Sequence, residues 1–192
     1  MSRLPDSARR ALTTVFAVIA AVLCLACAVA VAAEKASPPA KTAAAGRKPS
    51  PLVGTWKLVS IEERNADGKL VTPLDYGPAP LGLLMYDAGG HMSAQAVRRD
   101  RPRLESDDVH RVPPEQAKQA FVGFNGYFGT YDVDERAGVV VHHVEGALLP
   151  NWEGKDQRRR FTLSGNKLIL EPPSFQADGQ QRTRRLTWQR VQ

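Results

Sequence analysis

The stretch RFTLSGNKLILE, residues 160–171, contains the pattern that decides the fold. Phe161 and Leu163 alternate with polar residues before the turn SGN, and Leu168 and Leu170 occupy every second position after it. Side chains of a strand point alternately to its two faces, so this alternation predicts two strands, each with one buried face. The Gly-containing turn between them predicts an antiparallel hairpin.

Four other turn signals divide the chain in the same way. The five turns are NADG (65–68), DAGG (87–90), ERAG (135–138), SGN (164–166) and ADG (177–179). Five hairpins correspond to about ten strand legs, and closing such a sheet removes its exposed edges. The predicted fold class is therefore all-β, a closed or nearly closed antiparallel up-and-down β-barrel of about 8–10 strands.

One segment has helical periodicity. In PPEQAKQAFVGFN, residues 113–125, the prolines suit a helix start, and Ala117, Ala120, Phe121 and Phe124 follow the i, i+3, i+4, i+7 spacing of an apolar face. The spacing predicts one short helix inserted midway, with this face packed on the barrel core. The alternative is a lid in which Phe121 and Phe124 gate a ligand.

The first 33 residues have the composition of a secretory signal. Arg3, Arg9 and Arg10 precede an uncharged Ala/Val/Leu-rich run, residues 11–33, which contains the AxA-type site AVA at 30–32. We expect an exported protein, periplasmic or secreted. The run is also long enough to span a bilayer, so an uncleaved anchor that tethers the protein to the membrane is the alternative.

The remaining chain divides into a linker and one domain. Residues 34–50, EKASPPAKTAAAGRKPS, have little to bury and predict a disordered linker, and residues 51–192 are expected to form the barrel. Both cysteines, Cys24 and Cys27, lie in the apolar run, so the exported part would have no disulfide. The stretch CLAC resembles a lipoprotein cleavage site, so lipidation is another form of anchoring.

The charge of the chain does not indicate nucleic-acid binding. The sequence has 26 basic and 20 acidic residues, and removing residues 1–33, with three Arg and one Asp, leaves 23 and 19. The basic runs are expected to lie on a solvated barrel exterior, and contact with anionic lipid or polysaccharide is the alternative. These runs are Arg158, Arg159 and Arg160, and Arg182, Arg184 and Arg185.

Motifs at both ends of the expected domain carry a resemblance. The first strand begins LVGTWKLVS, with Gly54 and Trp56, and LTWQR near the end of the chain contains Arg190. The G-x-W motif with a late Arg resembles lipocalins, in which the Trp plugs the closed end of a barrel and the Arg stacks on it. The resemblance implies that these three residues determine the fold.

Further segments extend the similarity over residues 52–190. They are PLDYGPAPLGLLMYDAGGHMSAQAVRRDRP, FNGYFGTYDVD and VVHHVEGALLPNWEGKDQRRRF. The set resembles the lipocalin-like domain family of bacterial and fungal proteins. This resemblance implies a small barrel with a central cavity and no settled activity, although some relatives are linked to natural-product pathways.

Two adjacent histidines raise the question of a metal site. His142 and His143 are neighbours in a predicted strand, so they face opposite sides and cannot chelate one ion together. We place His142 inside the barrel and His143 outside. A site from His143 and Glu145 would need a third ligand, for example His91, and we expect no metal.

Alternation also gathers polar side chains on the inner face. Arg159 is expected to point inward, and Tyr127 and Tyr131 share a face, so a head-group site with His142 is the functional interpretation. Arg159 would bind a carboxylate or a carbonyl with forked hydrogen bonds. The alternative is an internal ion pair of Arg159, for example with Glu62 on the Trp56 face of the first strand.

Two loops are expected at the rim of the barrel. Trp152 in PNWEG, residues 150–154, lines the mouth of the cavity or caps the core. The Gly/Pro-rich segment DYGPAPLG, residues 75–82, is expected to be a rigid connection rather than a lid.

Sequence motifs of enzymes are absent from residues 34–192. The segment has no G-x-S-x-G elbow, phosphate loop, H-E-x-x-H or cysteine, so we assign no catalytic residue and no cofactor. The expected function is binding of a small, mostly apolar or amphipathic molecule in the barrel. The alternatives are a cofactor-free isomerase, cyclase or hydrolase in the same cavity, and a structural envelope protein.

Overall fold

The computed structural model describes residues 49–192, which contain ten strands, one α-helix and two short 3-10 helices. The expected export segment and residues 34–48 of the expected linker lie outside the described residues. The strands are β1 (Gly54–Arg64), β2 (Leu70–Val71), β3 (Leu81–Tyr86), β4 (His91–Val97), β5 (Phe124–Asp134), β6 (Val139–Ala147), β7 (Asp156–Ser164), β8 (Lys167–Glu171), β9 (Phe175–Ala177) and β10 (Gln180–Arg190). The helices are η1 (Val109–Arg111), α2 (Pro114–Val122) and η2 (Pro150–Trp152).

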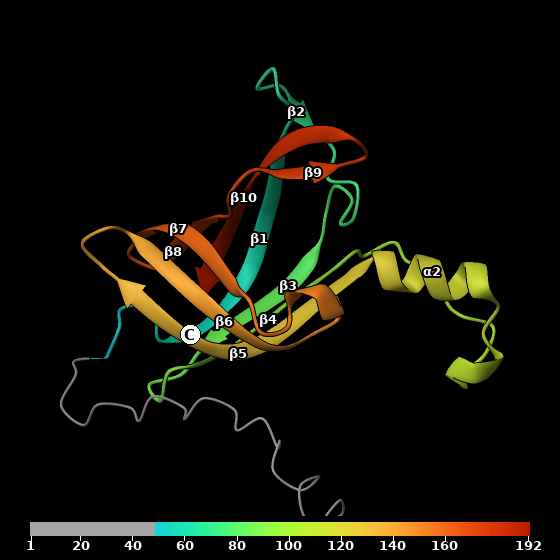
Figure 1. Ribbon diagram of the computed structural model, residues 1–192, viewed down its shortest axis with the longest axis horizontal. Coiled ribbons are helices and arrows are strands. Elements are labelled where there is room, and N and C mark those ends of the chain that lie inside the picture. Colours follow the sequence, from blue (N-terminus) through green and yellow to red (C-terminus); the bar gives the residue numbers. More distant parts are fainter. Residues whose placement is uncertain (1–48) are drawn as a thin grey trace, which may run out of the picture. The chain divides into compact units, whose positions relative to one another are not determined.

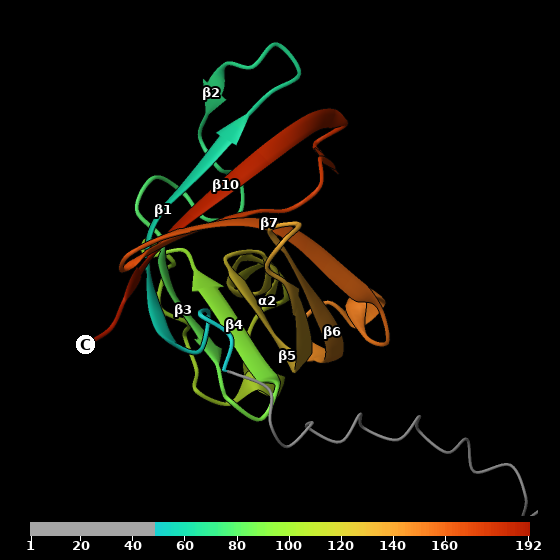
Figure 2. The same cartoon turned by 90° about the vertical axis from the view of Figure 1, so that its left-hand side faces the viewer.

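Eight of these strands form a closed antiparallel barrel. Their order is β1-β3-β4-β5-β6-β7-β8-β10, and β10 pairs back with β1. The short strands β2 and β9 extend β1 and β10 at one end, called here the β2/β9 end (Figures 1 and 2). Each of the five predicted turns joins two consecutive antiparallel strands, so the barrel prediction is confirmed.

The barrel interior is packed by the side chains that alternation turns inward. In β4, for example, Met92, Ala94 and Ala96 are buried and the residues between them are not. Burial of these apolar groups is the main favourable contribution to folding. The same core includes Leu58, Ile61, Leu84, Val140, Val144, Leu168, Leu170 and Trp188.

Trp56 closes the other end of the barrel. Its side chain is buried, and its Nε1 donates a hydrogen bond to the carbonyl of Leu52 at 2.9 Å. The guanidinium carbon of Arg190 lies 4.0 Å from the centre of the indole ring, which is a cation–π contact. Arg190 also donates to the carbonyls of Val53 and Pro51 at 2.6 and 2.8 Å, so it ties the last strand to the start of the first.

Gly54 is required by this contact. Its φ is +137°, a conformation that L side chains rarely adopt, and a Cβ built on it would lie 2.5 Å from Nη1 of Arg190. The G-x-W motif therefore keeps room for the guanidinium that covers Trp56.

A β-bulge in β1 changes which residues face inward. The pairing of β1 with β10 shifts between Leu58 and Ser60, and Val59 becomes an extra residue that is 60% exposed. Beyond the bulge the alternation is reversed, so Glu63 points into the barrel and is 1% exposed. The interpretation that Glu62 shares the face of Trp56 is wrong for this reason.

The helix α2 does not pack on the core. No residue in it is buried, and Phe121 and Val122 are 45% and 46% exposed. The expected packing is therefore wrong: the barrel core is closed by strand side chains, and the nine-residue helix projects before the start of β5 (Figure 1). No helix within residues 49–192 is long and apolar enough to cross a bilayer.

Candidate functional site

A buried histidine joins three strands by hydrogen bonds. His142 on β6 is 0% exposed, on the face that alternation predicts. Its Nε2 lies 2.7 Å from the hydroxyl of Tyr86 on β3, and its Nδ1 lies 2.8 Å from the hydroxyl of Tyr127 on β5. Both ring nitrogens of His142 are therefore satisfied by tyrosines.

Burial keeps this cluster neutral. It lowers the pKa of His142 well below its usual value, and the nearby charge of Arg159 lowers it further. Burial also raises the pKa of Tyr86 well above its usual value. A neutral imidazole accepts one hydrogen bond and donates one, so one tyrosine donates to His142 and the other accepts from it, keeping its own hydrogen for another acceptor.

Aromatic rings surround the Tyr86–His142–Tyr127 cluster. The ring of Tyr131 lies 4.7 Å from that of Tyr86, but its hydroxyl donates to the backbone carbonyl of Asp87, not to His142. Trp152 in η2 meets the ring of Tyr127 edge-on at 5.7 Å and packs against the core. The structure thus brings Tyr127, Tyr131 and Trp152 around His142.

His143 lies on the barrel exterior. Its Nδ1 is 2.7 Å from Asp156 on β7, and its Nε2 is 3.1 Å from Asp132 on β5. Partial burial disfavours the charged imidazole, but the hydrogen bonds to the two carboxylates prevail and raise its pKa. His91 instead contacts Asp87 in its own hairpin, and no group of three ligands within residues 49–192 is arranged to hold a metal ion.

A buried carboxylate pairs with two arginines near the β2/β9 end. Glu63 accepts from Nη1 of Arg182 at 3.2 Å and from Nε of Arg184 at 2.7 Å, with a second, shorter contact from Nη2 of Arg184. The expectation of a solvated exterior is therefore wrong for Arg182 and Arg184, which alternation turns inward on β10. Arg185, whose side chain is 53% exposed, pairs with Glu171 at 2.9 Å.

Arg184 is held between two aromatic rings. Its guanidinium carbon lies 4.9 Å from the ring centre of Tyr76 and 4.4 Å from that of Phe175. Tyr76 belongs to the Gly/Pro-rich loop between β2 and β3, it is buried, and its hydroxyl accepts from Nδ2 of Asn125 at 3.0 Å. These contacts attach the predicted rim loop to the barrel.

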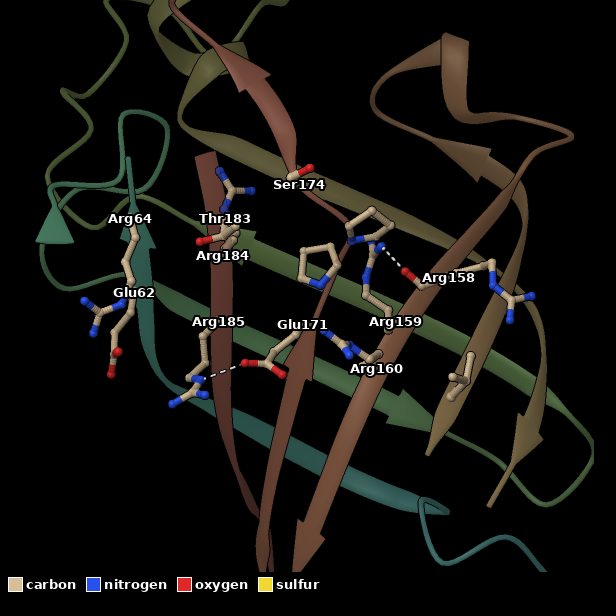
Figure 3. Close-up of a pocket in the computed structure, with 13 residues that line it drawn as sticks. Glu62, Arg64, Arg158, Arg159, Arg160, Glu171, Ser174, Thr183, Arg184 and Arg185 are labelled. Carbon is tan, nitrogen blue, oxygen red and sulfur yellow. Dashed lines mark hydrogen bonds and ion pairs between the residues drawn. The ribbon is translucent and has the colours of Figure 1, made fainter. Parts of the chain in front are cut away.

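Arg159 lines a pocket of about 580 Å³ near the β2/β9 end. Its Nη1 donates to the carbonyl of Arg158 at 3.1 Å and lies 3.5 Å from Oε1 of Gln157. Glu62 lines the same pocket, but no carboxylate within residues 49–192 forms an ion pair with Arg159. Figure 3 shows Arg159 reaching into the pocket and Arg158 turning away from it.

The pocket is strongly basic. Its lining includes two carboxylates, Glu62 and Glu171, and six arginines. Two of these arginines have carboxylate partners, and the other four form no ion pair within the described part of the chain. The six are Arg64, Arg158, Arg159, Arg160, Arg184 and Arg185.

Arg159 connects the pocket with the buried cluster. Arg159 on β7 pairs with Val140 on β6, which lies two residues before His142 on the same buried face. The charge of Arg159 lowers the pKa of both His142 and Tyr86. Of the five predicted ligand-binding residues, Arg159 lines the pocket, and His142 lies in the buried cluster with Tyr127, Tyr131 and Trp152.

Sequence reasoning missed Tyr86, Glu63 and Tyr76. The alternation in LGLLMY places Tyr86 on the face of Leu84, which was a usable signal for an inward hydroxyl. Glu63 depends on the bulge in β1, and Tyr76 lies in a loop without periodicity, so neither has a local signal.

The fold and its closure by Trp56 and Arg190 define a barrel of the lipocalin type. The model of the family described as "Lipocalin-like domain" matches residues 53–191, and the chain belongs to this family. Membership supports, in general terms, a barrel protein that binds a ligand.

Other comparisons add no specific function. Among solved structures, a lipocalin-like protein from Bacteroides uniformis ATCC 8492 matches with 16% sequence identity and a TM-score of 0.37, covering 73% of this chain and 98% of that chain. No curated protein matches the chain.

Proposed function

We propose that the protein binds a small amphipathic molecule and holds its acidic head group with Arg159 at the β2/β9 end of the barrel. The observation that carries the proposal is an inward guanidinium that has no carboxylate partner within residues 49–192. Arg182 and Arg184, which also point inward, share the carboxylate of Glu63. Arg159 is the interior arginine whose charge is left for a ligand.

The chemistry of Arg159 suits an anionic group. A partly desolvated charge is costly without a counter-charge, so an anion that enters the pocket is stabilised there. The planar guanidinium matches a carboxylate, sulfonate or phosphate with two parallel hydrogen bonds. Val139, Pro172 and Pro173 also line the pocket and offer apolar surface to the rest of the molecule.

Catalysis by the histidine cluster has less support. An acid–base reaction needs a group that reaches the substrate, whereas His142 is 0% exposed and both its nitrogens are bonded to tyrosines. The arrangement favours a binding protein whose cluster organises the barrel wall behind Arg159.

A pair of fluorescent probes tests the proposal. We would titrate the full chain with 8-anilinonaphthalene-1-sulfonate, which carries one negative charge, and with N-phenyl-1-naphthylamine, its uncharged analogue. Arg159→Met should weaken binding of the anionic probe by about 10- to 100-fold, as expected for a charged hydrogen bond worth roughly 1.5–3 kcal/mol. Binding of the uncharged probe should stay within about twofold.

Two further variants make the test specific. Arg136→Met removes the same charge from the exposed turn between β5 and β6, and should leave both titrations unchanged. Arg159→Lys keeps the charge without the fork and should give an intermediate loss. Equal losses for both probes, or an equal effect of Arg136→Met, would contradict a head-group role for Arg159.

We also propose that the protein is exported to the periplasm or secreted. The support is the Arg-flanked apolar run of residues 11–33 and its AxA-type site. The N-terminal sequence of protein isolated from its source should begin between Val31 and Glu34. A membrane-bound form that begins at Met1 or Ser2 would favour the uncleaved anchor.

A further inference from the structure

We propose that the arginine pocket selects the dianionic phosphate group of a phosphate monoester over a carboxylate. This inference rests on the proposed function, because it names the class of head group that the same site binds. It is carried by the charge of the lining and by the number of hydrogen-bond donors that reach the pocket.

The positive charge of the pocket lining is larger than a ligand with one carboxylate group would neutralise. The pocket has six arginines and two glutamates. Arg184 shares the single charge of Glu63 with Arg182, and Asp75 lies 3.6 Å from Arg184. Arg64, Arg159 and Arg160 line the pocket without an ion pair within residues 49–192. A carboxylate brings one negative charge, whereas a phosphate monoester carries roughly 1.5–2 at neutral pH.

The donors of the pocket also exceed the needs of a carboxylate. Arg184 donates to Glu63 through Nε and Nη2, and its Nη1 makes no hydrogen bond within the described residues. Ser174 and Thr183, which carry hydroxyl groups, line the pocket as well. Ser174 Oγ accepts from Gln181 Nε2 at 3.1 Å, so its own hydrogen is available to a ligand.

These donors match the three terminal oxygens of a phosphate ester. Two of these oxygens can accept the two parallel hydrogen bonds of the Arg159 guanidinium. The third oxygen is left to accept from a hydroxyl or from a second guanidinium. Arg184 is already held in place by Glu63 and by the rings of Tyr76 and Phe175, so little conformational entropy is lost when it binds. Figure 3 shows the two arginines on opposite sides of the pocket, on β7 and β10.

Competition between matched anions tests the selectivity. The anionic naphthalene probe bound to the full chain would be displaced with phenyl phosphate, phenyl sulfate and benzoate at pH 7.5. Phenyl sulfate has the same shape as phenyl phosphate but a single charge. We expect phenyl phosphate to bind at least about tenfold more tightly than either monoanion, because it gains a second charge-assisted contact.

A second measurement at pH 5 uses the titration of the ligand itself. The second pKa of a phosphate monoester is about 6, so phenyl phosphate becomes a monoanion at pH 5 and its advantage over phenyl sulfate should disappear. Phenyl sulfate stays a monoanion, so it reports any change in the protein between the two pH values. Arg160→Met should reduce the advantage at pH 7.5, whereas Arg136→Met should not.

The outcomes separate this inference from the proposed function. If probe binding depends on Arg159 but phenyl phosphate competes no better than phenyl sulfate, the phosphate selectivity is wrong and the head-group role of Arg159 stands. If probe binding does not depend on Arg159, the proposed function itself is wrong. An advantage of phenyl phosphate that persists at pH 5 would also overturn the inference, because it would not come from the second charge.

A phosphate monoester has two sources, lipid head groups and soluble metabolites. Dihexanoyl phosphatidic acid, used below the concentration at which it forms micelles, represents the first, and glucose 1-phosphate represents the second. Tighter binding of the lipid identifies a lipid phosphate, and equal binding identifies the phosphate group alone. Failure of both to displace the probe would contradict the proposal.

Discussion

Glu63→Gln removes the buried carboxylate that Arg182 and Arg184 share. The substitution keeps the size of the side chain and deletes its charge, so two inward guanidinium groups lose their common partner. Removing one member of a buried ion pair typically costs about 3–5 kcal/mol, because the remaining charge is left uncompensated. Arg184 keeps Asp75 at 3.6 Å, so we expect a loss near the lower value, about 3 kcal/mol.

Urea denaturation of the full chain measures this loss. For total stabilities of roughly 5–15 kcal/mol, a decrease of about 3 kcal/mol shifts the midpoint clearly while the slope stays constant. Glu62→Gln is the matched control, since it removes the same charge one residue earlier and should change the unfolding free energy by less than about 0.5 kcal/mol.

This pair of variants also tests the bulge at Val59. If Glu62→Gln destabilises the protein and Glu63→Gln does not, the alternation of β1 is not reversed and Glu63 is not the buried residue. Equal small effects would show that Arg182 and Arg184 do not depend on a buried carboxylate.

Two other predictions concern the closed end and the exterior histidine. Gly54→Ala should lower the free energy of unfolding in urea by roughly 1–3 kcal/mol, because its Cβ would collide with Arg190 at a strained φ. Gly68→Ala, which has open space around it, should lower this free energy less. Equal losses for the two variants would argue against the collision. The raised pKa of His143 stabilises the fold below its unfolded pKa of about 6.5, and this contribution is lost as pH rises through the folded pKa. The unfolding free energy should therefore fall over that window and fall less in His143→Gln; a pH profile identical in the variant would contradict the assignment.

The strands and their turns could be predicted because their signals are local. Gly, Asn and Asp in the five turns favour the tight backbone conformations of hairpins, and alternation in residues 160–171 identifies the two faces. The pairing of Trp56 with Arg190 followed from a resemblance, since nothing local links residues so far apart.

The exact inner face of β1 could not be predicted. The bulge at Val59 arises from the pairing with β10, and a shift of one residue exchanges Glu62 for Glu63. The opposite case is His142, whose face was predictable from its own strand. The inward face of Tyr86 could also be read from its strand, but its contact with His142 could not, because that contact spans 56 residues and depends on the register of every strand between them.

The helix shows where periodicity alone is insufficient. The apolar spacing around Phe121 correctly indicated a helix, but it does not say whether a surface is available to cover that face. In a closed barrel the inward side chains of the strands pack against one another. This core is therefore covered without α2.

The pairing of β1 with β10 makes the barrel a product of the complete chain. The hydrogen bond between Arg190 and Val53 joins residues 137 positions apart, so the first barrel strand emerges during synthesis long before its last partner exists. Contacts of such long range form slowly, and until the final 11-residue strand is made both β1 and β8 have an unpaired edge. Unpaired edges bind other strands, so a chain that ends before β10 should associate with its copies rather than fold.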